Sequence, residues 1–298
     1  MWGTLKVLEP FDMFANTIGP RLTASPAHKR AAEWARDTLR KWGISNARLE
    51  AWEFGRGWEL EKLTIEMVEP RYMPLTGYAE AWTPSTPGEL VIPAISTAGK
   101  TPEQIALMPI TGTALLQQDV ISAFIDKDRE QPEVVAGARI GAPVMPRAGG
   151  AGGAGRAGGT GRGGGAALAA VPSPTLQAAV LIKPSRGMHA TVFVQAGREN
   201  PAATQTAIVL AAEHYNIVAR LLAQGKPVTL RVNVKVKFHD ADRSSYNVVA
   251  EMPGTDPVLK NEVVMLGAHL DPSRVPARWP TGAVAITWCP SSGWRVTL

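Results

Sequence analysis

A continuous apolar run near the carboxyl end of the chain restricts the fold more than any other feature. Residues 263–268 read VVMLGA, with no polar side chain among them. A strand that is apolar on both faces belongs in the centre of a sheet that helices cover on both sides, whereas a half-exposed strand alternates apolar and polar residues. We therefore predict an α/β fold in which residues 263–268 form a buried central strand.

The amino-terminal part of the chain contains the clearest helix signal. Ser25 is suited to cap a helix whose first position is Pro26, because the N–H that proline lacks would be unpaired there. Gly43 is a natural stop. Five apolar side chains between these signals fall on one stripe: Ala31, Trp34, Ala35, Leu39 and Trp42. We predict one amphipathic helix that begins after Ser25 and ends before Gly43.

Short apolar or alternating runs predict the strands. They lie at residues 47–54, 63–68, 112–120, 122–125, 179–182, 191–194, 206–210, 228–238 and 246–252. The run at 228–238 alternates over its whole length, which is typical of a long half-buried strand. A second helix is predicted at residues 213–224, where Gly225 stops it.

A glycine-rich stretch interrupts this pattern. In residues 148–165, 11 of 18 residues are glycine and none is acidic. Such a segment buries too little apolar surface to offset the entropy lost on ordering it. We therefore predict a flexible surface loop at residues 148–165.

His269 and Asp271 directly follow the apolar run and are the best candidates for chemistry. Ligands of open α/β sheets collect beyond the carboxyl ends of the strands. A neutral imidazole is a good zinc ligand, and a nearby carboxylate can orient such a ligand. On spacing alone, His269 is equally explained as a hydrogen-bonded histidine at the end of a strand. Both interpretations stay open at this point.

The other polar groups favour structural roles. His239, Asp240 and Asp242 stand together between two predicted strands, where aspartate is common for backbone reasons. His214 falls within a predicted helix and is expected to pack or to face solvent. Ser245 lacks the glycine-flanked turn of a hydrolase nucleophile, which argues against serine hydrolysis.

Two segments carry a resemblance to a known family. SYNVVAEMPGTDPVLKNEVVMLGAHLD, at residues 245–271, resembles the beginning of the catalytic domain of zinc-dependent exopeptidases, the M28-like aminopeptidases and carboxypeptidases that include carboxypeptidase Q. IGPRLTASPAHKRAAEWARDTLRKWG, at residues 18–43, is similar to that family's first helix and its approach. The middle of the chain resembles the protease-associated insert that many members carry. The likeness covers most of residues 18–271.

The resemblance implies a zinc-exopeptidase-type mixed sheet with helices on both faces. It makes residues 1–84 the N-terminal part of the peptidase domain, 85–226 a β-rich protease-associated insert, 227–271 the start of the catalytic core and 272–298 an aberrant tail. It also implies a peptide substrate and a secreted or periplasmic location. Two zinc ions would activate a water and polarise the scissile carbonyl. His269 would bind one zinc ion, and Asp271 would act in catalysis by supporting the site from just outside the metal ligands.

The residues after Asp271 depart from the family pattern. The family continues with a glycine-rich turn that carries a bridging aspartate, and later with further acidic and histidine ligands. Here no aspartate, glutamate or histidine follows Asp271, and Cys289 is the one conventional ligand left. Since zinc takes about four ligands, we expect the two-metal site to be incomplete and this chain to have little or no activity.

A shifted reading frame is our hypothesis for this break. Codon degeneracy permits the segment PSRVPARWPTG, at residues 272–282, to be read one base out of frame as IAGTGAMADG, a family-like turn with its aspartate. The tail at residues 272–298 shows no period of a helix or a strand. We therefore expect it not to continue the domain that precedes it.

The alternatives to the exopeptidase are a protein-interaction module and a nucleic-acid-binding protein. The first alternative is a non-catalytic protein-interaction module built on the insert, and binding of about two zinc ions would distinguish the peptidase from it. A homodimer is compatible with the sequence. No nucleic acid is expected as a partner, because the arginines of the glycine-rich stretch lack interleaved aromatic residues. No membrane is expected, because no apolar run reaches transmembrane length, and no signal peptide is visible.

Overall fold

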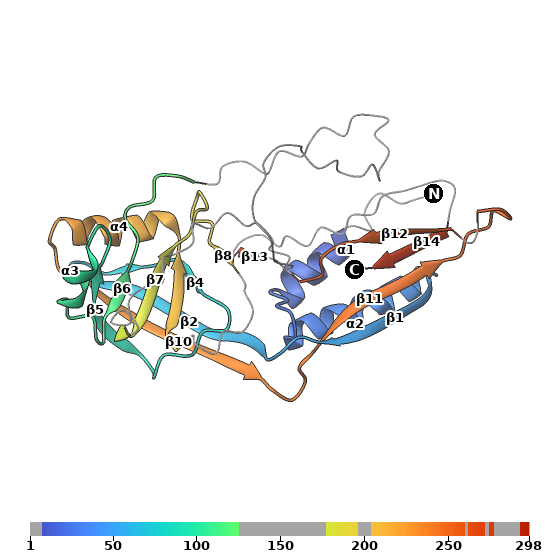
Figure 1. Ribbon diagram of the computed structural model, residues 1–298, viewed down its shortest axis with the longest axis horizontal. Coiled ribbons are helices and arrows are strands. Elements are labelled where there is room, and N and C mark those ends of the chain that lie inside the picture. Colours follow the sequence, from blue (N-terminus) through green and yellow to red (C-terminus); the bar gives the residue numbers. More distant parts are fainter. Residues whose placement is uncertain are drawn as a thin grey trace, which may run out of the picture.

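The computed structural model describes residues 8–124, 177–195, 204–259, 262–271, 274–276 and 293–297. In this part of the chain the elements form two lobes, one built on an eight-stranded sheet and the other on a four-stranded sheet (Figure 1). The predicted glycine-rich loop at residues 148–165 lies outside these ranges. None of the described helices has the length and apolar character needed to cross a bilayer.

The larger lobe is a mixed sheet with the strand order β3-β2-β10-β5-β6-β7-β9-β4. Neighbours among β5, β6, β7 and β9 are parallel, and the other pairs are antiparallel. Helix α4 packs against β5 and β7. The elements are β2 Gly57–Glu69, β3 Met73–Pro74, β4 Gly77–Ala79, β5 Leu90–Ser96, α3 Pro102–Ala106, β6 Ala114–Leu116, β7 Val180–Pro184, β9 Thr206–Leu210, α4 Ala212–Ala223 and β10 Thr229–His239. The predicted α/β fold class with a mixed sheet is confirmed.

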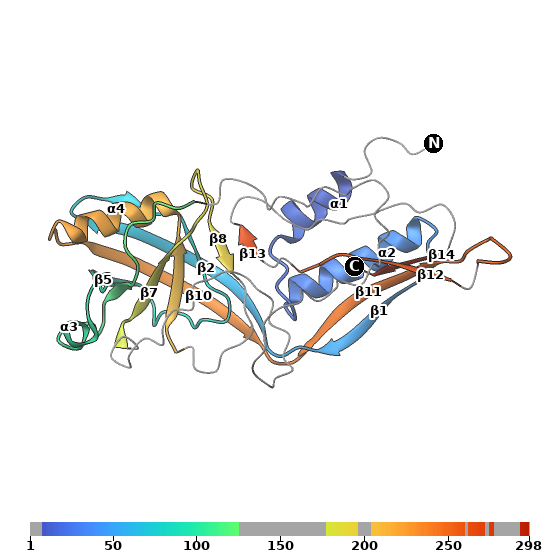
Figure 2. The ribbon, with the colours of Figure 1, turned by 45° about the horizontal axis from the view of Figure 1, so that its top comes forward.

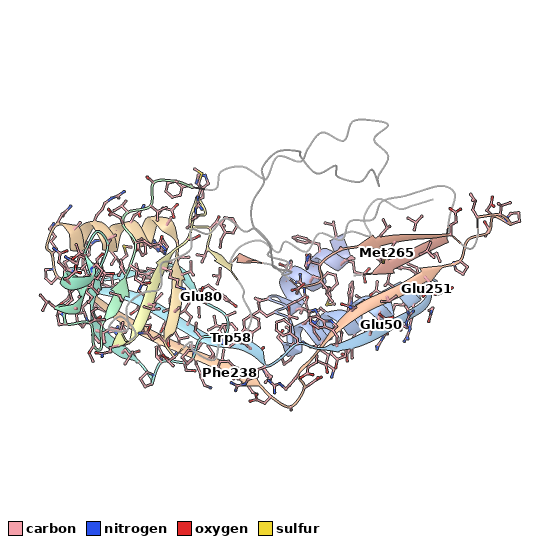
Figure 3. The ribbon with its side chains drawn as sticks, viewed as in Figure 1. Glu50, Trp58, Glu80, Phe238, Glu251 and Met265 are labelled. Carbon is pink, nitrogen blue, oxygen red and sulfur yellow. The ribbon has the colours of Figure 1, made fainter. Side chains whose placement is uncertain are left out.

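The core of this lobe follows from the alternation of β10, which confirms the predicted long strand. Leu230, Val232 and Val234 are buried on one face, as a period of two requires. Trp58 of the neighbouring β2 lies in the same core (Figure 3). Its indole Nε1–H donates to the carbonyl of Thr83 at 3.0 Å, so the buried polar atom of this large side chain is paired.

The smaller lobe is a four-stranded sheet with the order β1-β11-β14-β12. Helix α2 packs against β1 and β11, with the short α1 and a π-helical turn η1 ahead of it (Figure 2). A separate two-stranded sheet pairs β8 with β13. The elements are α1 Leu8–Asp12, η1 Met13–Ile18, α2 Pro26–Lys41, β1 Ser45–Glu53, β8 Phe193–Gln195, β11 Ser244–Met252, β12 Val263–Gly267, β13 Arg274–Pro276 and β14 Gly293–Thr297.

Helix α2 confirms the predicted amphipathic helix. The side chain of Ser25 accepts the backbone N–H of His28 at 3.1 Å, which is the expected N-cap. Gly43 follows the helix with a φ of +78°, a left-handed conformation that glycine adopts without strain. Ala31 and Ala35 of the predicted stripe are buried against β1 and β11. The helix start therefore has a well-defined position, which matters because it lines the cleft described below.

A continuous two-stranded ribbon joins the lobes. β1 leads into β2, and β10 leads into β11. β1 pairs with β11 and β2 pairs with β10, both antiparallel. At the bend, the backbone N–H groups of Phe54 and Gly55 both donate to the carbonyl of Arg243, at 3.0 and 3.2 Å. β2 and β10 lie outside the predicted insert, but they share the eight-stranded sheet with β5, β6, β7 and β9, which lie inside it. The predicted boundaries at 84/85 and 226/227 therefore divide one sheet.

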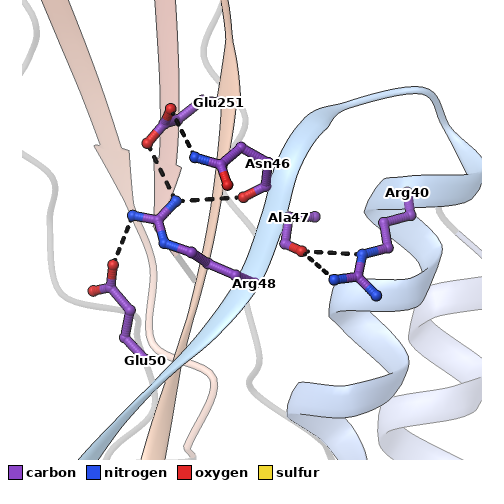
Figure 4. Close-up of polar contacts among 6 residues, drawn as sticks. All are labelled: Arg40, Asn46, Ala47, Arg48, Glu50 and Glu251. Atoms are coloured by element: carbon purple, nitrogen blue, oxygen red, sulfur yellow. Dashed lines mark hydrogen bonds and ion pairs between the residues drawn. The ribbon is translucent and has the colours of Figure 1, made fainter.

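Surface polar contacts reinforce the smaller-lobe end of the ribbon (Figure 4). The guanidinium of Arg48 on β1 contacts Glu50 at 2.7 Å and Glu251 of β11 at 3.2 Å. Arg40, in the last turn of α2, donates to the carbonyl of Ala47 at 2.7 Å. These contacts connect the end of the helix and both strands, although exposed ion pairs contribute little free energy individually.

The position of β12 corrects the prediction of a buried central strand. The strand is present, but it lies at the edge of the four-stranded sheet. Val263 is 69% exposed and Met265, labelled in Figure 3, is 67% exposed. An apolar run specifies which side chains are apolar and not which segments of the chain cover them.

Two further predictions were wrong. Residues 122–124 of the strand predicted at 122–125 form no strand, and residue 125 lies outside the described residues. The side chain of Asn216 accepts the N–H of the preceding Ile121 and donates to its carbonyl. The tail was expected not to continue the preceding domain, but β14 inserts between β11 and β12 and pairs with both. The rest of the predicted strands and the helix at 213–224 are confirmed, with shifted ends.

Candidate functional site

A cleft of about 590 Å³ opens where three parts of the smaller lobe meet. These parts are the start of α2, the bend of the ribbon and the turn that follows β12. The turn contributes the predicted site residues His269 and Asp271. The lining consists of Thr23, His28, Trp52, Phe54, Ser245, Tyr246, Asn247, Gly267, Ala268, His269, Leu270 and Asp271.

The two predicted site residues form a hydrogen-bonded pair at the rim of this cleft. His269 Nδ1 lies 3.0 Å from Asp271 Oδ1, and the hydroxyl of Thr23 donates to Asp271 Oδ2 at 2.9 Å. An ionised carboxylate only accepts, so Nδ1 of His269 carries the proton of this bond. In this tautomer Nε2 presents a lone pair, and the side chain is 83% exposed. This is how a histidine is held when its other nitrogen binds a metal.

The surroundings keep Asp271 ionised. Its partial burial acts to raise the pKa of the carboxyl, but the hydrogen bonds from His269 and Thr23 and the nearby imidazoles outweigh burial. The pKa of Asp271 therefore lies below its ordinary value. A carboxylate in this state remains an acceptor for the His269 N–H across the physiological range of pH.

Arg21 holds the backbone of the same turn through a buried hydrogen bond. The side chain is fully buried, and its Nε donates to the carbonyl of Leu270 at 3.1 Å. Its Nη1 donates to the carbonyls of Phe14 at 2.6 Å and Gly19 at 3.0 Å. Burial lowers the pKa of the guanidinium, and Asp271 acts in the opposite direction. Arg21 and Thr23 thus fix both the backbone and the carboxylate of the turn.

His28 lines the floor of the cleft but does not complete a catalytic serine arrangement. Its Nδ1 lies 3.4 Å from the hydroxyl of Ser245, and both side chains are buried. Burial lowers the pKa of His28; Asp271 acts to raise it, and Arg21 to lower it. The imidazole is therefore neutral near pH 7. Because the Ser245 side chain is buried, its hydroxyl is not presented to solvent.

The polar turn at residues 239–242 is structural, as the sequence indicated. His239 pairs with Glu59 at 3.2 Å, Asp240 with Arg56, and Asp242 with Lys29 at 2.8 Å. These contacts stabilise the bend of the ribbon. His214 accepts the backbone N–H of Thr76 through Nδ1 at 2.7 Å, which is also a structural role.

The donor set fits a zinc ion only in part. His269 offers one oriented imidazole nitrogen, but the residues that the structure describes contain no group of three histidine, cysteine, aspartate or glutamate side chains able to hold a metal. Zinc sites use about four ligands, at least three of them from protein. This part of the chain therefore supplies one element of a metal site and not the whole site, and we assign no step of hydrolysis to it.

Thr23, Arg21 and His28 were not anticipated from the sequence. They precede the His269–Asp271 turn by more than 240 positions, and only the fold brings them together. One signal was available for His28. The N-cap at Ser25 places it in the first turn of α2, whose amino end points at the cleft.

Comparisons with known proteins support the fold. No protein-family model matches the sequence, and no curated protein gives a significant match. A peptidase M28 precursor from Shewanella amazonensis SB2B has a similar crystal structure, with a TM-score of 0.61 and 18% identity over 97% of this chain. A zinc aminopeptidase from Bacillus subtilis and an aminopeptidase from an Aneurinibacillus strain give TM-scores of 0.46 and 0.42, with 11% and 17% identity over 97% and 86% of this chain. The chain spans 62%, 59% and 51% of the length of these three structures.

Proposed function

We propose that this chain carries part of the active site of a zinc-dependent exopeptidase, a hydrolase that removes terminal residues from peptides. The observation that carries the proposal is the 3.0 Å hydrogen bond between His269 and Asp271 at the rim of the cleft. It leaves Nε2 of an exposed imidazole free to bind a metal, in a place where a peptide has access.

Two further observations support this function. The segment at residues 245–271 resembles the beginning of the catalytic domain of zinc-dependent exopeptidases. The fold is similar to that of a protein named as an M28 peptidase precursor. In the proposed assignment His269 is a zinc ligand, and Asp271 orients it from outside the ligand shell. Bound zinc would supply a Lewis acid at this rim.

We further propose that the chain as written does not turn over peptides. No aspartate, glutamate or histidine follows Asp271, so the ligands that would join His269 have no source in the tail. A one-base shift of the reading frame after Asp271 would restore a turn with an aspartate. We also propose that residues 85–226 are a protease-associated insert, although β5, β6, β7 and β9 of this region share a sheet with β2 and β10.

The test compares the written chain with a version whose residues after Asp271 are encoded in the shifted frame. Metal content is measured by mass spectrometry after dialysis, and hydrolysis with aminoacyl anilides and dipeptides, with and without a chelator. We expect about two zinc ions and chelator-sensitive hydrolysis in the restored version, and neither in the written chain. His269→Ala should abolish both properties of the restored version.

A matched control tests whether the loss is specific to His269 or follows from removing any exposed histidine. His189→Asn removes an exposed histidine outside the cleft, and asparagine tolerates the φ of +56° at that position. It should change neither zinc content nor hydrolysis. A restored version that binds no zinc, or one whose hydrolysis survives His269→Ala, would contradict the proposed function.

A further inference from the structure

Three aromatic rings form a supported row that runs from the larger lobe to the cleft. Trp82 is buried, and its indole Nε1–H donates to the carbonyl of Arg56 at 2.8 Å, which anchors the ring. Phe54 lies against it with ring centroids 5.9 Å apart. Trp52 then meets Phe54 edge to face, with centroids 5.7 Å apart and an interplanar angle of 84°. Each ring therefore limits the movement of the next.

The last ring of the row is only partly covered. Trp52 is 39% exposed, and both Trp52 and Phe54 line the same cleft as His269 and Asp271. A tryptophan held by its neighbours offers a large apolar surface and loses little side-chain entropy when a ligand binds. This is the property that makes tryptophan a frequent anchor of binding sites.

Trp52 and Phe54 belong to one wall of the cleft, and the other side chains of this wall are uncharged. Tyr246, Ser245 and Asn247 of β11 complete it beside the two aromatic residues. The hydroxyl of Tyr246 is already engaged, because it donates to Asp242 at 2.9 Å. No lysine, arginine, aspartate or glutamate lines the cleft other than Asp271, whose two carboxylate oxygens both accept hydrogen bonds within the described residues. The wall therefore favours an uncharged apolar group over a charged side chain.

We propose that Trp52 and Phe54 form a side-chain subsite for an aromatic or large aliphatic residue of a peptide. This inference rests on the proposed function, because it assigns the side-chain preference of the same cleft. It makes Trp52 a specificity-determining residue, and it places the bound side chain against the ring row while the peptide backbone lies toward His269.

The subsite is tested by binding and not by hydrolysis, so that its failure can be told from failure of the proposed function. The full chain is titrated with N-acetylphenylalaninamide, and with N-acetylasparaginamide as a polar probe, by ligand-observed saturation-transfer NMR. We expect the phenylalanine probe to bind more tightly than the asparagine probe. We expect Trp52→Ala to weaken its binding about tenfold, and Trp52→Phe to weaken it less.

Trp42→Ala is the matched control. Trp42 is 41% exposed, about as much as Trp52, but it does not line the cleft and lies at the other end of α2, roughly 21 Å from His28 along the helix. This variant should bind the probe like the wild-type chain. The inference is overturned if the wild-type chain binds neither probe or does not prefer phenylalanine. It is equally overturned if Trp52→Ala keeps its folded circular dichroism spectrum and binds as well as Trp42→Ala.

Discussion

Replacing Arg21 by methionine is expected to lower the free energy of unfolding by about 3 kcal/mol and to release the His269–Asp271 turn. The guanidinium is 2% exposed and donates to three backbone carbonyls, those of Phe14, Gly19 and Leu270. The first two belong to the segment ahead of α2, and the third lies between the two predicted site residues. One side chain thus connects the two segments that form the cleft.

The magnitude follows from the carbonyls that lose their donor. The contact to Gly19 is only part-buried, so water can replace the guanidinium there, whereas the contacts to Phe14 and Leu270 are buried. A hydrogen bond from a charged donor contributes about 1.5–3 kcal/mol. Two such bonds at the lower end of that range give about 3 kcal/mol. The lower end applies because burying the guanidinium is itself unfavourable, and methionine refills much of the volume.

The assay is urea unfolding followed by circular dichroism at constant pH. Arg36→Met is the control, since Arg36 lies on the surface of α2 and pairs with its neighbour Asp37 at 2.8 Å. It should cost less than about 1 kcal/mol. Arg21→Lys should fall between the two, because one ammonium cannot reach all three carbonyls. If Arg21→Met shifts the urea midpoint no more than Arg36→Met does, the assigned role of Arg21 is wrong.

Three other predictions concern the ribbon and its ends. Trp58→Ala should destabilise the chain by about 4 kcal/mol in urea unfolding, because it empties a fully buried site and leaves the carbonyl of Thr83 without its donor; a loss below about 1 kcal/mol would contradict the assigned core. Asp242→Asn should flatten the acid limb of the stability profile. Hydrogen bonds from Lys29, the N–H of Ser244 and Tyr246 lower the pKa of Asp242 in the folded chain, so its contribution is present above about pH 4 and is lost as the pH falls through the lowered pKa. Because Lys29 and Asp242 are 45% and 43% exposed, the difference at neutral pH should stay below about 1 kcal/mol, and a constant difference down to low pH would refute the linkage. Arg48→Ala should leave the urea midpoint close to that of the wild-type chain despite the two ion pairs of Figure 4, because exposed ion pairs contribute little, and a clear shift of the midpoint would contradict this.

Local signals in the sequence predicted much of the fold. Ser25, Pro26 and Gly43 defined the ends of α2 because capping and left-handed backbone conformation are local properties of the chain. The alternation of β10 revealed which of its faces is buried, because a strand repeats every two residues whatever it pairs with.

The environment of an element was harder to predict than its type. β12 is a strand, as its apolar run indicated, but its place at the sheet edge depends on which segments pair with it. The same limit applies to Asn216, whose side chain pairs with both backbone groups of Ile121 from about 95 residues away. Contacts of this kind have no local signature.

The candidate site contains one contact that the local sequence could indicate and others that it could not. His269 and Asp271 stand two positions apart, so the sequence could indicate them as a pair, and the structure brings them within 3.0 Å. Thr23 and Arg21 hold this pair from the opposite end of the sequence, and they were missed because nothing local to them indicates a contact with residues 270 and 271.

The proposed metal-binding role of His269 depends on Asp271 holding the ring with the proton on Nδ1 and the lone pair on Nε2. A two-bond ¹H–¹⁵N correlation spectrum of the histidine rings, recorded at slightly alkaline pH on the full chain without metal, measures this directly. We expect the Nδ1–H tautomer for His269 in the wild-type chain, and its partial loss in Asp271→Asn, whose amide no longer has to accept the proton. An Nε2–H tautomer for His269 in the wild-type chain would refute this arrangement, because the nitrogen assigned to the metal would then carry a proton.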